Sequence, residues 1–181
     1  MRKFRALLII ALMIIVSFIL QTSLFRFLNI GGISPNLMII VTVSLSIVYG
    51  DKKGTVIGFI CGLLCDIFFS DYLGFYALVY CFTGYLSGKF ERIIFPDSLK
   101  LPIAAIAGSD LLYGFFCYVF RFVINGKFFF GSFILHYVLP EILYTTLIAL
   151  IIYPLIIWIY KRFMRPIRES EKNFAKRKST L

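Results

Sequence analysis

Three acidic residues fall inside long apolar stretches of this sequence: Asp66, Asp110 and Glu141. A carboxylate inside a membrane is costly, so a functional role such as a proton-linked one is an open hypothesis for each of these acids, although we favour a structural role. In such a role, neighbouring hydrogen-bond donors hold the buried acid. Neither Asp66 nor Asp110 has a candidate base or metal ligand nearby in sequence. An intramembrane enzyme or a lipid flippase is therefore the least favoured interpretation.

Other reactive side chains are few and poorly placed for catalysis. His136 is the single histidine, and we interpret it as an interfacial side chain and not as a proton relay. The four cysteines all lie in apolar runs: Cys61, Cys65, Cys81 and Cys117. We expect them to be small buried hydrophobic side chains, and not to form disulfides or a metal site. The sequence has no glycine-rich phosphate loop and no His-Glu-x-x-His pair. We expect no catalytic residue, no cofactor, no metal site and no nucleic-acid partner.

The elements that must position these residues are membrane helices. Hydrophobic residues make up 60% of the chain, above the roughly 45–50% of an average soluble domain. We predict an all-α, polytopic protein whose residues 1–160 form six transmembrane helices in a compact bundle. The predicted spans are about 6–25, 36–50, 54–69, 74–88, 101–123 and 140–160.

The boundaries of these spans rest on local signals. Ser34 is predicted to cap the second span, with Pro35 in its first turn and Asn36 as a buried polar candidate. Residues 51–53, Asp-Lys-Lys, are predicted to form a tight hydrophilic turn. The apolar run from 128 to 160 is too long for one span across about 30 Å of hydrocarbon. We therefore divide it at Pro140 into an interfacial segment, 128–139, and a last span in which Glu141 is mainly a helix-start residue.

The third predicted span carries a regular series of small residues that ends in an acid. Gly54, Gly58, Gly62 and Asp66 follow one another at four-residue steps, so they lie along one side of a helix. Such spacing lets two helix backbones approach closely in a membrane. A second pair, Gly84 and Gly88, ends the next span. We predict that these two spans form a tight hairpin packed through glycine.

The distribution of basic residues indicates the orientation of the bundle. If both termini are cytoplasmic, the 19 lysines and arginines all lie inside except Arg26, Arg121 and Lys127. Cytoplasmic loops of membrane proteins carry such an excess. The chain closes with a basic cytoplasmic tail, 161–181, which is predicted to lie on anionic lipids or to act only as a topological anchor.

The order of these features resembles the rod shape-determining protein MreD family. That family has a Pro-Asn opening span 2, a Gly-x-x-x-Gly-x-x-x-Asp helix, and a Leu-Gly opening the next span. Here these features correspond to Pro35, Asn36, Gly58, Gly62, Asp66, Leu73 and Gly74. Asp110 and the Leu139-Pro140-Glu141 start of the last span are also similar to the family, so the resemblance covers nearly the whole chain.

The resemblance implies a non-enzymatic scaffold of the bacterial cell-elongation machinery in the cytoplasmic (inner) membrane. It implies binding to the single-span protein MreC and, through it, links to MreB, RodA and a penicillin-binding transpeptidase of peptidoglycan synthesis. The family's fold is similar to the S-subunits of energy-coupling-factor transporters, which leaves a vitamin-binding subunit as the alternative. Those subunits typically carry Ala-x-x-x-Ala in span 1, whereas Ala6 and Ala11 are five residues apart here, which counts against transport.

Overall fold

The computed structural model describes residues 2–27, 33–70, 72–92, 99–125, 131 and 134–164, and the elements in these ranges are helices. The α-helices are α1 (Arg2–Phe27), α2 (Leu37–Tyr49), α3 (Asp51–Phe69), α4 (Phe75–Lys89), α5 (Lys100–Asn125) and α7 (Leu139–Ile159). The short elements are the 3-10 helix η1 (Phe90–Arg92) and the π-helices η2 (Ile134–Val138) and η3 (Tyr160–Met164). The predicted all-α class is confirmed.

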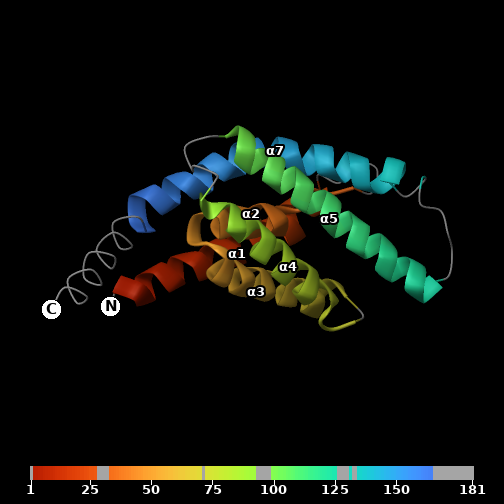
Figure 1. The fold of residues 1–181 in the computed structure, drawn as a ribbon, viewed down its shortest axis with the longest axis horizontal. Helices are drawn as coiled ribbons and strands as arrows, with labels where there is room; N and C mark the ends of the chain where they lie inside the picture. Colours follow the sequence, from red (N-terminus) through yellow and green to blue (C-terminus); the bar gives the residue numbers. More distant parts are fainter. Residues whose placement is uncertain are drawn as a thin grey trace.

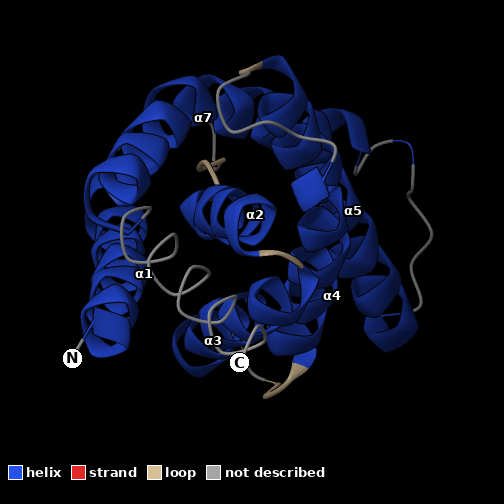
Figure 2. Cartoon of the chain, turned by 60° about the vertical axis from the view of Figure 1, so that its left-hand side comes forward, coloured by secondary structure: helices blue, strands red, loops and turns tan. Residues whose placement is uncertain are grey.

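Successive α-helices run in opposite directions along the long axis of the molecule (Figure 1). The beginning of α1 and the end of α7 therefore lie at the same end of the bundle. In Figure 2, α2 lies in the middle and the other α-helices surround it. Contacts of α2 with α1, α3, α4, α5 and α7 agree with this central position.

The central helix α2 is buried along nearly its whole length, from Leu37 to Val48. Its sequence has no charged residue, so it can be enclosed on every side without an unpaired charge. Two of its hydroxyls are satisfied by their own helix, since Ser44 donates to the carbonyl of Ile40 at 2.5 Å and Ser46 to that of Thr42 at 2.6 Å. Burial of α2 is therefore compatible with Ser44 and Ser46, whereas the buried hydroxyl of Thr42 has no hydrogen-bond partner among the described residues.

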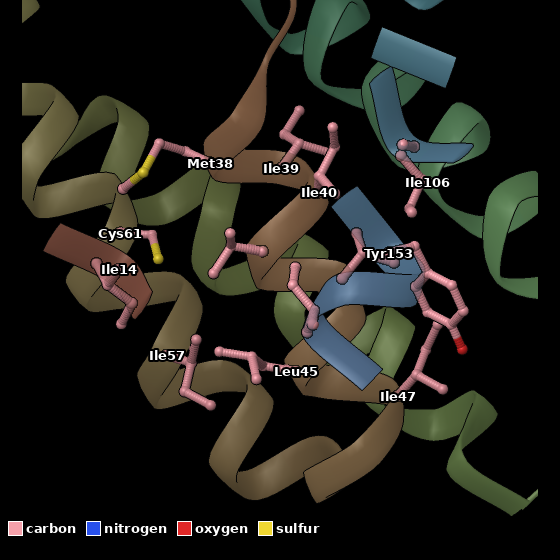
Figure 3. Close-up of a cluster of buried hydrophobic side chains, with 14 of the residues drawn as sticks. Ile14, Met38, Ile39, Ile40, Leu45, Ile47, Ile57, Cys61, Ile106 and Tyr153 are labelled. Carbon is pink, nitrogen blue, oxygen red and sulfur yellow. The ribbon is translucent and has the colours of Figure 1, made fainter. Parts of the chain in front are cut away.

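Hydrophobic side chains from the surrounding helices fill the space around α2 (Figure 3). Ile14 of α1, Ile57 of α3, Ile106 of α5 and Tyr153 of α7 all belong to this cluster of buried residues. Tyr153 is fully buried. The core thus joins segments that are more than 100 residues apart in sequence.

Apolar residues also cover the outside of the bundle. Leu7 and Leu12 of α1 are 66% and 61% exposed, and Leu143 and Ile151 of α7 are 63% and 70% exposed. Helices that are apolar both inward and outward are typical of a bundle in lipid. The structure and the composition together indicate a multi-pass membrane protein.

Among the residues that the structure describes, three helical stretches are long and apolar enough to cross a membrane: Phe4–Ser23, Lys100–Phe120 and Ile134–Phe163. The apolar helix α2 has only 13 residues, and α4 has 15. At 1.5 Å per residue these reach about 20 Å and about 22 Å, less than a hydrocarbon core of about 30 Å. The six-span bundle similar to S-subunits therefore stays a prediction.

Two predicted boundaries, one at each end of the second span, are wrong. Asp51, Lys52 and Lys53 do not form a turn but are the first residues of α3. The chain reverses at Gly50 alone, whose φ of 84° is a left-handed value that glycine adopts without strain. The N-cap of α2 is Asn36, and not Ser34, because the Asn36 side chain accepts a hydrogen bond from the Ile39 N–H at 3.2 Å.

The last α-helix, α7, begins at Leu139, one residue before the predicted start, but the helical run that contains it begins earlier. It runs without a break from Ile134 through η2 into α7, and Pro140 lies inside this run. Proline lacks an N–H and its ring clashes with the carbonyl one turn earlier in a regular helix. The wider π-helical turn of η2 lies where that carbonyl belongs, which explains how the helix continues. An interfacial position for 128–139 stays a prediction, and 128–130 and 132–133 lie outside the described residues.

Candidate functional site

The glycine series of α3 packs directly against α4. An added Cβ at Gly54 would lie 2.6 Å from the carbonyl oxygen of Gly84, and one at Gly58 would collide with the carbonyl of Tyr80. One at Gly62 would collide with the carbonyl of Tyr76. Moving four residues forward along α3 thus corresponds to moving four residues back along α4, as in any antiparallel pair of helices. We call this contact the glycine seam.

The glycine seam extends to a further close backbone contact at Gly88. At Gly88 of α4, a Cβ would lie 2.5 Å from the Cα of Asp51. The predicted seam residues Gly54, Gly58, Gly62, Gly84 and Gly88 are therefore brought together in one antiparallel contact. Because the obstructing atoms are mostly backbone, side-chain rotation cannot relieve the collisions, and the two helices can lie this close only with glycine at these positions.

Asp66 continues the seam and caps the neighbouring helix. Its side chain is 1% exposed and accepts backbone hydrogen bonds from Gly74, Tyr76 and Ala77 at 3.1, 2.9 and 2.8 Å. These N–H groups belong to the N-terminus of α4, where no earlier residue supplies carbonyl partners. Negative charge is also favourable at this end of a helix. Asp66 therefore acts as an N-cap for α4 that is supplied by α3.

Asn36 connects three helices at the start of α2. Its side-chain oxygen accepts from the Ile39 N–H and also from the Tyr80 hydroxyl of α4, at 2.8 Å. Its backbone N–H donates to the hydroxyl oxygen of Thr145 in α7 at 3.1 Å. The side-chain oxygen of Gln21 in α1 accepts the nearby N–H of Met38 at 3.0 Å. The buried beginning of α2 is thus held by side chains of α1, α4 and α7.

Asp110 of α5 lies next to this junction. Its side chain is 1% exposed, and neither carboxylate oxygen has a well-formed hydrogen bond. The Thr145 hydroxyl lies beside it. Glu141 of α7 lies at the same level as Asp110, because Gly114, one turn after Asp110, meets Val138, one turn before Glu141. Glu141 is half-buried. We call Asn36, Tyr80, Asp110, Glu141 and Thr145 the polar cluster.

A close contact between α5 and α7 positions the two acids. A Cβ at Gly114, one turn after Asp110, would lie 2.9 Å from a methyl group of Val138, one turn before Glu141. The absence of a side chain at Gly114 therefore lets α7 approach α5 at this level. Tyr113 of α5 borders the polar cluster on the side of α4, where its ring centre lies 5.7 Å from that of Tyr80.

The polar cluster offers oxygen atoms but no positive charge. Every lysine and arginine in the described ranges lies in the first or last two turns of its helix, away from Asp110. Within the same ranges no group of three or more His, Cys, Asp or Glu side chains could hold a metal ion. The arrangement can bind a proton or an external cation, and it contains no nucleophile paired with a base.

Sequence reasoning identified the acids and Asn36 but not their partners. It predicted that Glu141 mainly starts a helix, and Glu141 does lie in the first turn of α7. It did not predict the π-helix η2, which precedes α7 and continues into it. It missed Tyr80, Thr145, Gln21 and Gly114 altogether. A polar residue at a helical position facing the core is the signal that could have found Thr145 and Gln21.

The comparisons with known proteins place the chain in one family. The sequence profile of the rod shape-determining protein MreD family matches residues 1–163. No curated protein and no solved structure gives a significant match. The chain belongs to the MreD family, and its role lies in the determination of rod shape.

Proposed function

We propose that this MreD-family chain is a non-enzymatic membrane scaffold of the bacterial cell-elongation machinery, and that it maintains rod shape by binding MreC. The family match over residues 1–163 is the observation that carries the proposal. Through MreC the scaffold is linked to MreB, RodA and a penicillin-binding transpeptidase. Peptidoglycan synthesis is then carried out by these partners and not by this chain.

The placement of the polar residues supports a scaffold. Asp66 is occupied by three backbone N–H groups, and Asn36 by a backbone N–H and the Tyr80 hydroxyl. Side chains engaged in this way fix the positions of helices and are not available to a substrate. These side chains therefore serve to hold the helices together.

The membrane arrangement is part of the same proposal. All six α-helices lie within the bilayer of the inner membrane, with both termini cytoplasmic. The short helices α2 and α4 find their packing and hydrogen-bond partners inside the bundle, through the glycine seam and the polar cluster. This is possible because longer helices enclose them. The basic tail, 161–181, binds anionic lipids at the cytoplasmic face, where each basic residue contributes about 1 kcal/mol.

A substitution in the glycine seam tests the scaffold. Gly62→Ile inserts a branched side chain against the carbonyl of Tyr76, so α3 and α4 must separate. We expect reduced co-purification of MreC and rounded cells, with uptake of small molecules unchanged. The matched control is Gly108→Ile, because nothing lies within 4 Å of a Cβ at Gly108.

The same experiment discriminates the transport alternative. An S-subunit of an energy-coupling-factor transporter binds a vitamin-sized ligand, and its loss creates a nutritional requirement. Wild-type and Gly62→Ile proteins are therefore assayed for binding to a vitamin panel. Tight vitamin binding by the wild type, together with normal cell shape in the variant, would falsify the scaffold proposal.

A further inference from the structure

We propose that Asp110 and Glu141 form a proton-binding site inside the bundle, in which a single proton is shared by the two carboxyl groups and joins α5 to α7. The proton comes from water and returns to water, so the site needs no other reactant. The inference concerns the isolated chain and does not depend on MreC binding.

The burial of Asp110 is the first step. An ionised carboxylate that is removed from water and has no hydrogen-bond donors is far more costly than a neutral carboxylic acid. Both oxygens of Asp110 are in this position. The Thr145 hydroxyl accepts the Asn36 N–H, so its own proton can point to Asp110, but it can serve only one of the two oxygens.

The surroundings supply no positive charge that could take the place of a proton. The groups that face Asp110 or lie next to them come from α2, α4, α5 and α7, and they are neutral or acidic: Asn36, Tyr80, Tyr113, Thr145 and Glu141. Behind Tyr80, α3 adds the thiols of Cys61 and Cys65, and beyond Cys65 the carboxylate of Asp66, none of which is positively charged. Within the described ranges the lysines and arginines lie near helix ends. None of the described residues therefore supplies the neutralising charge, and a proton can.

Glu141 determines that the proton is shared. Two neighbouring carboxylates in a site of low polarity do not both ionise, because the second negative charge is repelled by the first. Glu141 is half-buried, while Asp110 is almost completely buried. Glu141 is thus the acid through which a proton can enter or leave, and Asp110 is the acid that retains it.

Loss of the proton has a structural consequence. Two negative charges then face each other across the junction of α5 and α7, one turn away from the close contact of Gly114 with Val138. A shared proton replaces this repulsion with a hydrogen bond. The site therefore makes the α5–α7 junction tighter when it is protonated than when it is not.

Infrared spectroscopy of the purified full chain tests the site directly, because a protonated carboxyl group has its own carbonyl band. We expect this band in the wild type at neutral pH. Asp110→Asn should abolish it, since the half-buried Glu141 ionises once its partner is gone. Glu141→Gln should retain the band at a shifted frequency, since Asp110 stays neutral without a second acid. Asp51→Asn, which changes an acid at the start of α3, is the matched control and should leave the band unchanged.

The pH dependence of unfolding in detergent supplies a second measurement. The folded chain holds a proton that the unfolded chain releases at neutral pH, so stability must fall as the pH rises. The expected slope is about a tenfold change in the unfolding equilibrium constant per pH unit. Asp110→Asn should remove this slope. If Asp110 had only a structural role, the substitution would change the stability by the same amount at every pH.

Several outcomes would overturn the site. A folded wild type without a protonated carboxyl band at neutral pH would show that the acids are ionised. A band that appears only after sodium or potassium is removed would identify a metal cation as the occupant. If Asp110→Asn does not fold, an unshifted band in Glu141→Gln would still contradict sharing.

Discussion

At the scale of single residues, the buried acids differ in what surrounds them, and this separates their expected behaviour. Asp66 accepts three backbone N–H groups through both of its oxygens. An asparagine has one acceptor oxygen and turns an amide donor toward the remaining N–H groups. We expect Asp66→Asn to destabilise the chain by about 1–3 kcal/mol, the range for a buried group left unsatisfied. Equilibrium unfolding in detergent measures this cost.

Asp110 provides the comparison for that prediction. No backbone N–H donates to its oxygens, so Asp110→Asn removes no hydrogen bond of this kind. We expect it to be tolerated far better at neutral pH than Asp66→Asn, while Asp66→Leu should be the most harmful of the three. Equal losses for Asp66→Asn and Asp110→Asn would contradict the capping role of Asp66.

At the scale of elements, the hairpin of α3 and α4 depends on the absence of side chains along the glycine seam. Gly58→Ala places a methyl group against the carbonyl of Tyr80, so the two backbones must move apart. We expect a loss of about 1–3 kcal/mol, as for overpacking of a close-packed core. Gly108→Ala in α5 meets nothing within 4 Å and should be neutral or stabilising by up to about 1 kcal/mol.

The junction of α5 and α7 should respond more mildly. A methyl group at Gly114 meets the side chain of Val138, which can shift, and not a backbone atom. We therefore expect Gly114→Ala to cost less than Gly58→Ala in the same unfolding assay. A larger loss at Gly114 would mean that the α5–α7 contact, and not the glycine seam, is the more rigid of the two.

At the scale of the whole molecule, the alternation of helix directions predicts which ends face which side of the membrane. Leu73 is 78% exposed at the turn between α3 and α4, and Lys52 lies at the opposite end of α3. In a chain whose native cysteines are replaced, we expect Leu73→Cys to react with a membrane-impermeant thiol reagent in intact cells. Lys52→Cys should react only after lysis.

The charge distribution gives this experiment its direction. Lys52 belongs to the end of the molecule that also carries Lys53, Lys89 and Lys100, and basic residues prefer the cytoplasmic side. External labelling of Lys52→Cys would refute both the orientation and the proposed six-span arrangement. Labelling at Leu73→Cys after lysis alone would have the same meaning.

The sequence by itself determined the features that arise from local order along the chain. Four-residue spacing placed Gly54, Gly58 and Gly62 on one side of a helix, and apolar runs located most helices within a few residues. Local signals failed at Asp51–Lys53 and at Pro140, where the chain continues a helix through residues that often end one. At Asp51–Lys53, the reversal of the chain at Gly50 lets α3 begin at once. At Pro140, the π-helical turn of η2 lets the helix continue.

Only the tertiary structure decided what the polar residues do, because their partners are distant in sequence. Asp66 caps α4 from another helix, and Asn36 meets Thr145 across 109 positions. The placement of Asp110 and Glu141 at the same level depends on the approach of α5 to α7 at Gly114. The enclosure of α2 likewise depends on five other helices. Periodicity in a sequence reports which face of a helix is apolar, but not which helix will face it.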